Sequence, residues 1–471
     1  MKNFLFSICF LFVITINWSC QQDKKTSFVP GDATVKGTII GIENQMVFVK
    51  DENPLNTDLD TVLVDGEGTF SYTTHLEKPK YISFEIDGEF LTLYMRPNDQ
   101  ISFTSNHKNF FDQIKFDGGS SVYNNYMVDF SKSGQKFQNN LVFIYLNDEK
   151  RVSSILDSIK NMHHQRLDGL TKSFTNIDDF FVKSETKRID YEWGYRKITY
   201  PLYHKFYSSS KELILPPDYE SFLNILDKND SSSLQLKSFR DFIDAYYYTQ
   251  INKTIIEKLP YKEVMRIRFR LMAKSFQSQA IVDYLCYDAV KNTVISSGLR
   301  DADEITFFFD SICKNEIYRT YIQKQYEKWN HLRKGQIAKD FTFVSATGDS
   351  IKLSDFKGKY IFLDVWATWC KPCLEQLPFL HKLQADFKSK KIVFISISVD
   401  QDKKVWLKSL KDKQMGGIQL YAGRSDVLYN YYLITGIPRF ILIDKDGKFV
   451  ESSCQMPSNG VEKILTSLEG I

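Results

Sequence analysis

The fold of this chain is decided by the stretch YIFLDVWATWCKPC at residues 360–373. Residues 360–366 form an almost continuous apolar run, typical of a strand that is buried on both faces of a sheet. Cys370 and Cys373 follow, and a helical pattern continues to about residue 388. Two cysteines separated by two residues in the first turn of a helix can reach disulfide geometry. The stretch therefore predicts a buried strand that leads directly into a dithiol at a helix N-terminus.

The position of Cys370 favours a reactive thiolate. The unpaired N–H groups of the first helical turn and the positive end of the helix dipole stabilise a negative charge there. Thiols in such CxxC motifs have pKa values of roughly 3.5–7.5, against about 8.5 for a free cysteine. Lys371 adds a cation, and Pro372 fits the first turn because the N–H group that proline lacks has no intrahelical partner there. We expect Cys370 to face solvent and to act as the nucleophile.

Strand-like and helical patterns alternate through residues 335–471. The elements expected after the first helix are a buried strand at 392–399, a helix around 405–407, a strand at 440–443, a turn at 444–447, a strand at 449–450 and a final helix to residue 468. This order predicts an α/β domain in which helices cover both faces of a mixed sheet.

Residues 363–373 closely resemble the active site of thioredoxins, and in particular that of the membrane-anchored TlpA/ResA-like thiol–disulfide oxidoreductases. The resemblance implies a thioredoxin fold for residues 335–471 and a redox-active disulfide between Cys370 and Cys373. It also implies that Asp364, six residues before Cys370, is the buried acid that accepts a proton from Cys373.

The same resemblance implies a substrate-binding surface around the dithiol. Gly436-Ile437-Pro438, with a strand after it, is similar to the loop whose cis-proline faces the dithiol in this family. Arg439 stands where many relatives carry threonine, and is either a solvated side chain or a group that binds a substrate carboxylate or backbone. Gln376 stands where the subgroup often carries glutamate. The substrate-binding residues implied are Trp369, Lys371, Pro372, Ile437, Pro438 and Arg439.

Two other interpretations of the motif have less support. A zinc site needs a second cysteine pair or histidines at matching spacing, whereas residues 335–471 offer only Cys454 and His381. A peroxidase of the peroxiredoxin type needs a threonine or serine three residues before its nucleophile, and position 367 is alanine. We therefore predict no metal site, and no cofactor other than the disulfide itself.

Residues 30–117 predict a small antiparallel β-sandwich. Branched or apolar runs at 35–40 and 46–49 suit strands, and Asp65-Gly66 and Asp87-Gly88 lie between such runs, where Asp-Gly is a strong indicator of a hairpin. The arrangement resembles the N-terminal domains that often precede thioredoxin modules in lipoproteins of this kind.

Residues 118–334 predict an α-helical domain, because apolar residues recur at spacings of three and four. Much of the aromatic content lies there, and a packed core is favoured over a groove for peptide or glycan. For His163 and His164, a solvated pair on a helix is the favoured interpretation, and a metal site is the alternative. For Cys286 and Cys313, two buried thiols are the favoured interpretation, and a disulfide is the alternative.

The N-terminus predicts export. Residues 4–16 form an apolar run, shorter than the roughly 20 residues of a spanning helix, and fit the central region of a secretory signal. Cys20 follows Ser19 and resembles the cysteine of a bacterial lipobox, although Asn17 stands where that motif prefers leucine. We expect a signal peptide over 1–19, lipidation of Cys20 and a linker over 20–29; an ordinary cleaved signal is the alternative.

The composition suits an exported multidomain protein. The 471 residues are 43% hydrophobic and 15% aromatic, enough for several cores, and a net charge of +3 gives no electrostatic footprint for nucleic acid.

We expect a lipid anchor facing the periplasm, in the outer rather than the inner membrane. The predicted function is a thiol–disulfide oxidoreductase that reduces or exchanges disulfides of extracytoplasmic proteins. Its expected partners are those proteins and a membrane thiol-transporting reductant donor. The alternative is a non-catalytic lipoprotein that binds glycan or peptide and uses the thioredoxin fold as a scaffold.

Overall fold

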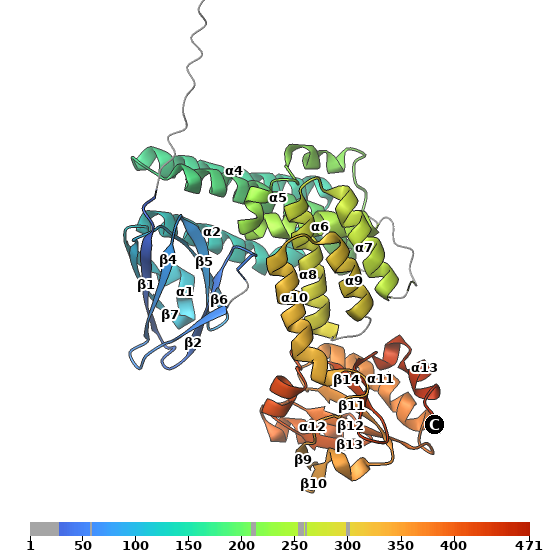
Figure 1. Ribbon diagram of the computed structural model, residues 1–471. Helices are drawn as coiled ribbons and strands as arrows, with labels where there is room; N and C mark the ends of the chain where they lie inside the picture. The colour runs from blue at the N-terminus through green and yellow to red at the C-terminus, as the bar shows by residue number, and fades with distance from the viewer. Residues whose placement is uncertain (1–27, 57–58, 209–212, 253–258, 260, 298–301) are drawn as a thin grey trace, which may run out of the picture. The chain divides into compact units, whose positions relative to one another are not determined.

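The computed structural model of the chain describes residues 28–56, 59–208, 213–252, 259, 261–297 and 302–471 (Figure 1). Strands come first in chain order, helices follow, and an α/β sheet ends the chain. This confirms the predicted multidomain order of β, helical and α/β parts. The expected signal segment and Cys20 lie outside the described residues. Within the described ranges, no helix combines the length and the apolar character needed to cross a membrane.

The chain divides into two compact units. Among the described residues, the first comprises those up to Val49 together with Asp60–Lys132, and the second comprises those of Lys50–Leu59 together with those of Ser133–Ile471. The domain boundaries expected at residues 118 and 335 stay predictions. The start of the first long helix packs with the strands, while the helical and α/β parts belong to one unit.

The N-terminal strands form two four-stranded sheets, in the orders β4-β1-β7-β8 and β3-β2-β5-β6. The strands and helices of this part are β1 (Gly31–Ile40), β2 (Met46–Asp51), β3 (Leu59–Leu63), β4 (Thr69–Leu76), β5 (Lys80–Ile86), β6 (Glu89–Met95), β7 (Gln100–Asn106), α1 (Phe110–Gln113), β8 (Lys115–Gly118) and α2 (Ser121–Asn139). Of the two predicted Asp-Gly hairpins, Asp87-Gly88 joins the paired strands β5 and β6, with φ values of 50° and 83° as a tight hairpin requires. The hairpin predicted at Asp65-Gly66 is wrong, because the turn there leads from β3 to β4, which lie in different sheets. The sandwich is not wholly antiparallel, because β1 and β7 pair in parallel.

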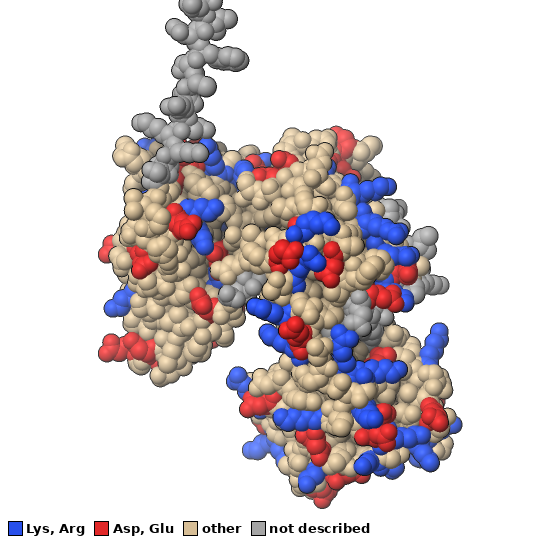
Figure 2. Space-filling view, in the orientation of Figure 1, with Lys and Arg blue, Asp and Glu red and all other residues tan. Residues whose placement is uncertain are grey.

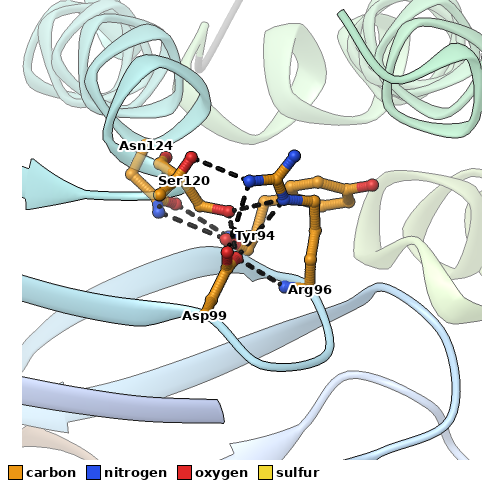
Figure 3. Close-up of polar contacts among 6 residues, drawn as sticks. Tyr94, Arg96, Asp99, Ser120 and Asn124 are labelled. Atoms are coloured by element: carbon orange, nitrogen blue, oxygen red, sulfur yellow. Dashed lines mark hydrogen bonds and ion pairs between the residues drawn. The ribbon is translucent and has the colours of Figure 1, made fainter. Parts of the chain in front are cut away.

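A polar network fixes the start of α2 against the end of β6 (Figure 3). The Asn124 side chain accepts a hydrogen bond from the Tyr94 backbone N–H over 2.8 Å and donates one to its carbonyl oxygen over 3.2 Å. Arg96 Nε donates to Ser120 Oγ over 3.2 Å, and Ser120 also bonds the Asp99 carboxylate. Because these groups are largely buried, separating α2 from the sheets would leave them unsatisfied. This explains why the first unit extends past residue 118.

The central part is helical, as predicted. Its helices are α3 (Leu141–Tyr145), α4 (Glu149–Ser173), α5 (Asp179–Tyr207), α6 (Lys237–Asn252), α7 (Tyr261–Ser275), α8 (Gln279–Ser297), α9 (Ala302–Ile312) and α10 (Glu316–Trp329), with short 3₁₀ helices at Tyr219–Ile225, Ser231–Gln235 and Asn330–Leu332. Many aromatic rings pack in pairs, among them Tyr287 and Tyr318, whose centroids are 4.3 Å apart. His163 is buried against Ser133, and His164 bonds Asp190.

The C-terminal sheet has seven strands in the order β10-β9-β13-β12-β11-β14-β15. Its elements are β9 (Thr342–Ser345), β10 (Ser350–Lys352), a 3₁₀ helix (Leu353–Phe356), β11 (Tyr360–Trp366), α11 (Lys371–Asp386), β12 (Ile392–Ser398), α12 (Lys403–Asp412), β13 (Ile418–Tyr421), a π-helix (Val427–Tyr431), β14 (Arg439–Ile443), β15 (Phe449–Cys454), a 3₁₀ helix (Pro457–Asn459) and α13 (Val461–Thr466). β11, β12 and β13 run parallel, and β14 and β15 run antiparallel to their neighbours. Strands β9, β10 and β13 add to the elements predicted from the sequence.

The core of this part forms where α11 and α13 cover one face of the sheet. Phe362 of β11 and Leu442 of β14 pack with Leu380 of α11 and Leu465 of α13. On the face of the C-terminal part that Figure 2 shows, basic and acidic side chains are interspersed. Because α11 and α13 pack on the sheet, the sheet is a rigid frame whose strand ends can hold a reactive group.

Candidate active site

Strand β11 carries the chain directly to the cysteine pair. Every residue of β11 is buried, with β12 parallel on one side and β14 antiparallel on the other. The chain turns after Trp366, and α11 begins at Lys371 with Cys370 as its N-cap. Cys370 Sγ accepts a hydrogen bond from the backbone N–H of Cys373 over 3.2 Å. The sulfur of Cys370 thus lies against the first N–H groups of a helix, where a negative charge is stabilised.

Cys370 and Cys373 form a disulfide, with their Cα atoms 5.3 Å apart. In this oxidised form Cys370 is 4% exposed, so it does not face solvent as the sequence suggested. The reason is geometric, since the sulfur is turned toward Cys373 and toward the helix N–H groups. Around the disulfide, the Trp369, Lys371 and Pro372 side chains are exposed, Trp369 to 69%.

Asp364 is buried on the face of β11 that α11 covers. Side chains alternate along a strand, so Asp364 shares its face with Phe362, which packs against α11. The carboxyl group is 4% exposed, and its burial raises its pKa to about 7, while a hydrogen bond from Ser396 Oγ over 3.3 Å lowers it. A carboxyl group with this pKa can take up or release a proton at neutral pH.

Asp400 fixes the loop that leads to Cys370, a role that the sequence analysis missed. Its carboxylate accepts hydrogen bonds from the Thr368 backbone N–H over 3.1 Å and from Thr368 Oγ1 over 2.7 Å. Ser398 Oγ also donates to it over 2.7 Å. The signal for this role was its position two residues after the end of a strand that neighbours β11 in a parallel sheet, where polar residues converge.

The peptide bond between Ile437 and Pro438 is cis, as the resemblance implied. Val365 of β11 pairs with Arg439 of β14. Pro438 therefore lies beside the carboxyl end of β11, from which the chain leads to Cys370. The structure thus brings the disulfide, the buried acid and the cis-proline together at one end of the sheet.

Comparison with known proteins gives this arrangement a family. A thioredoxin-like family model matches residues 358–449. The thiol–disulfide oxidoreductase ResA of Bacillus cereus is 30% identical over 132 residues, which cover 28% of this chain and 76% of that protein. ResA of Geobacillus kaustophilus is 30% identical over 138 residues, covering 29% and 78%. The chain belongs to the ResA-related thioredoxin-like family.

Solved structures from other bacteria match a similar share of this chain. The thioredoxin domain of a thiol–disulfide oxidoreductase from Bacteroides vulgatus is 32% identical and covers 28% of this chain and 98% of its own, with a TM-score of 0.27. A thiol:disulfide interchange protein from Bacteroides sp. is 31% identical and covers 29% and 93%, with a TM-score of 0.27. The residues that the family model matches lie in the C-terminal region of this longer chain.

Two positions at which this chain departs from the ResA-related pattern have clear contacts. Gln376 Oε1 accepts a hydrogen bond from the Ser458 backbone N–H over 3.1 Å, so its side chain joins α11 to the 3₁₀ helix that follows β15. Glu375, one residue earlier, is exposed. Arg439 is 4% exposed, which excludes a fully solvated side chain, and its guanidinium carbon lies 5.7 Å from the centroid of the Trp329 ring.

A groove with a volume of about 880 Å³ lies next to the disulfide loop. Its lining includes Trp369, Val405 and Tyr429, together with Asp402 and Arg424. The groove offers aromatic and aliphatic surface with charged groups at its sides, a combination that suits an amphipathic ligand. Cys286, Cys313 and Cys454 are buried and take no part in the disulfide, and Cys454 is the last residue of β15.

Proposed function

We propose that this protein reduces disulfides of extracytoplasmic proteins through Cys370 and Cys373. The observation that carries the proposal is the disulfide at the N-terminus of α11, with a buried acid of raised pKa on the covered face of β11 and a cis-proline beside the end of that strand. The ResA-related proteins named above match this part of the chain.

The first step is attack by the Cys370 thiolate on a client disulfide. The new bond joins Cys370 Sγ to one client sulfur, the client S–S bond breaks, and the other client sulfur leaves as a thiolate. The N–H groups at the start of α11 stabilise the attacking thiolate. The leaving thiolate takes a proton from solvent.

The second step releases the client. Cys373 gives its proton to the Asp364 carboxylate and attacks Cys370 Sγ as a thiolate. The bond between Cys370 and the client breaks, the second client thiolate leaves, and the Cys370–Cys373 disulfide forms. The client has gained two electrons, and the protein has lost two.

Net reduction requires a donor that returns two electrons to the disulfide. In an oxidising compartment that donor is proposed to be a membrane protein that carries thiol reducing equivalents. A proline immediately before the second cysteine resembles reducing thioredoxins and supports this direction.

Clients are proposed to bind along the surface formed by Trp369, Lys371, Pro372, Ile437 and Pro438. The exposed Trp369 ring offers apolar contact beside the groove, and the backbone around a cis-proline offers hydrogen-bonding groups to an extended client strand. Arg439 is proposed to support this surface from beneath, since its side chain is buried.

The protein is proposed to be exported and anchored through lipid on Cys20, facing the periplasm from the outer membrane. Cells fed a radiolabelled fatty acid should label the wild-type chain but not Cys20→Ala. Equal labelling of both would show that Cys20 carries no lipid.

Insulin reduction with dithiothreitol as donor tests the activity. Wild-type protein should accelerate precipitation of the insulin B chain, and Cys370→Ser should remove the acceleration. A wild-type rate equal to that of Cys370→Ser would contradict an enzyme and favour a binding protein with a thioredoxin-like scaffold. A reduction potential of about −120 mV would instead group the protein with oxidants, because thioredoxin, a reductant, has a potential of about −270 mV.

A further inference from the structure

Residues 329–339 join the end of α10 to the C-terminal sheet, and we call them the clasp. The clasp is anchored to the sheet edge at β15. The Gly335 N–H donates to the Phe449 carbonyl oxygen, and the Phe449 N–H donates to the Gln336 carbonyl oxygen, each over 2.8 Å. One side of the clasp is therefore fixed to a rigid element.

The other side of the clasp contacts residues 427–438, which end at the cis-proline and are called here the cis-proline loop. His331 Nε2–H donates to the Tyr431 carbonyl oxygen over 2.8 Å, and the two rings lie with centroids 4.6 Å apart. Tyr431 Oη donates to the Ile337 carbonyl oxygen over 3.3 Å. Contacts thus run in both directions between the two segments.

A second tyrosine of the loop is held more deeply. Tyr432 Oη donates to the Lys339 carbonyl oxygen over 2.6 Å, and its ring packs against Phe341 and Phe449. Burial raises the pKa of Tyr432, so its hydroxyl stays a hydrogen-bond donor. Tyr432 therefore joins the cis-proline loop to the clasp through its hydrogen bond and its ring contacts.

The last contact lies next to the cis-proline itself. Arg439 follows Pro438 directly, and its guanidinium lies over the ring of Trp329, the last residue of α10. Both side chains are buried. A planar guanidinium over an indole ring is a favourable contact, more so where water is excluded. The end of the helical part therefore supports the residue adjacent to the substrate-facing proline.

The loop needs such support because its own backbone is not in a preferred conformation. Leu433 has a φ of 50°, a left-handed conformation that is unfavourable for a residue with a branched side chain. Such conformations persist where surrounding contacts fix them. The same loop also contributes Tyr429 to the groove beside Trp369.

We propose that Trp329 and His331 are positioning residues for the client-binding surface. His331 holds the cis-proline loop through Tyr431, and Trp329 holds Arg439, the residue directly after the loop. Together they position the backbone at Pro438 and the wall of the groove at Tyr429. The helical part of the chain thereby takes part in client recognition without touching the client or the disulfide. This inference rests on the proposed function, because it assigns a determinant of client binding to the same site.

The test compares variants of the full-length chain. His331→Ala removes the hydrogen bond to Tyr431, and His331→Gln places an amide N–H near the same position. Trp329→Ala removes the ring under Arg439, and Trp329→Phe keeps an aromatic face. Ile322→Ala is the matched control, since Ile322 is buried on the same face of α10 two turns earlier.

Two substrates separate positioning from a general loss of stability. With a disulfide-bearing polypeptide such as insulin, the alanine variants should raise KM about threefold to tenfold, as expected for one lost contact. With a small aromatic disulfide that does not need the loop, kcat/KM should stay at the wild-type value. The reduction potential should also be unchanged, and His331→Gln and Trp329→Phe should recover most of the lost KM.

Several results would overturn the proposal. A wild-type KM for insulin in both alanine variants would do so, as would equal losses with both substrates or the same change in Ile322→Ala. If Trp329→Ala does not fold, His331→Ala decides alone, because His331 is only half-buried.

A separate measurement distinguishes this failure from failure of the proposed function. If the wild-type protein does not reduce insulin, the proposed function is wrong, and the clasp is judged by amide hydrogen exchange. Residues 431–437 should exchange faster in His331→Ala than in the wild type or Ile322→Ala. Equal exchange would show that the clasp does not hold the loop.

Discussion

Ser396 lies directly opposite Asp364 on the neighbouring strand, and its hydroxyl donates a hydrogen bond to Asp364 Oδ2 over 3.3 Å. Both side chains are buried. Burial raises the pKa of Asp364 to about 7, and the bond from Ser396 moderates the rise. The pair therefore provides a proton acceptor whose pKa is near neutral. It lies on the face of β11 that also packs against α11, the helix that carries Cys373.

Asp364→Asn should stabilise the oxidised protein at high pH. The unfolded chain loses the Asp364 proton near pH 4, whereas the folded protein keeps it until about pH 7. The free energy of unfolding therefore falls as pH rises from 4 to 7 and stays low above 7. Removing the acid should restore up to about 4 kcal/mol at pH 8 and nothing below pH 4. Calorimetry of both proteins at both pH values measures this, and identical unfolding transitions at pH 8 would contradict the raised pKa.

The same substitution should slow client release. Without a carboxylate to take its proton, Cys373 attacks the mixed disulfide about 10²–10⁴-fold more slowly, the usual range for loss of a general base. In the wild type, the rate of release should rise with pH through an apparent pKa near 7, and this dependence should disappear in Asp364→Asn. Acid-quenched samples analysed by mass spectrometry give the rate. Release with an unchanged rate and pH profile would remove Asp364 from the mechanism.

Ser396→Ala should move the pH profile of release upward. The Ser396 hydroxyl favours the ionised carboxylate, so its loss raises the pKa of Asp364 further. One hydrogen bond corresponds to an upward shift of about half a pH unit to one unit. Ser452→Ala is the matched control, because it removes a buried hydroxyl from β15 of the same sheet. A downward shift, or the same shift in both variants, would contradict the assignment.

Asp400→Ala should disturb the loop that carries Cys370. Its carboxylate accepts bonds from Thr368 and Ser398, and losing it leaves buried donors unsatisfied, at about 2–3 kcal/mol. Because Cys370 itself is displaced, rates should fall with both polypeptide and small disulfides, unlike the clasp variants. Asp426→Asn is the matched control, an exposed acid on the same groove. Wild-type rates in Asp400→Ala would show that the loop holds without it.

The geometry of the candidate site was predictable from the sequence because its signals are local. The strand at 360–366, the cysteine pair and the cis-proline loop each depend on a few consecutive residues. The hairpin at Asp87-Gly88 was predictable for the same reason, since only a few residue types allow its backbone conformation.

The features that the sequence did not reveal depend on contacts across long separations. Asp400 meets Thr368, and Trp329 meets Arg439, only after the sheet has formed. The parallel pairing of β1 with β7 likewise joins strands that no hairpin connects. In the helical part, the buried face of α10 contains Tyr318 and Ile322, while Ile317 is exposed. Contacts with neighbouring helices determine which face of α10 is buried.

Trapping clients on Cys373→Ser tests the central claim most directly. With Cys373 replaced, a client that has reacted with Cys370 cannot be released, so mixed disulfides should accumulate. Cells expressing the variant are acid-quenched, and the adducts are identified by mass spectrometry. The account predicts extracytoplasmic proteins joined through Cys370 and lost on reduction, and none in the double variant Cys370→Ser, Cys373→Ser. Absence of adducts in the single variant, or equal adducts in the double variant, would contradict the account.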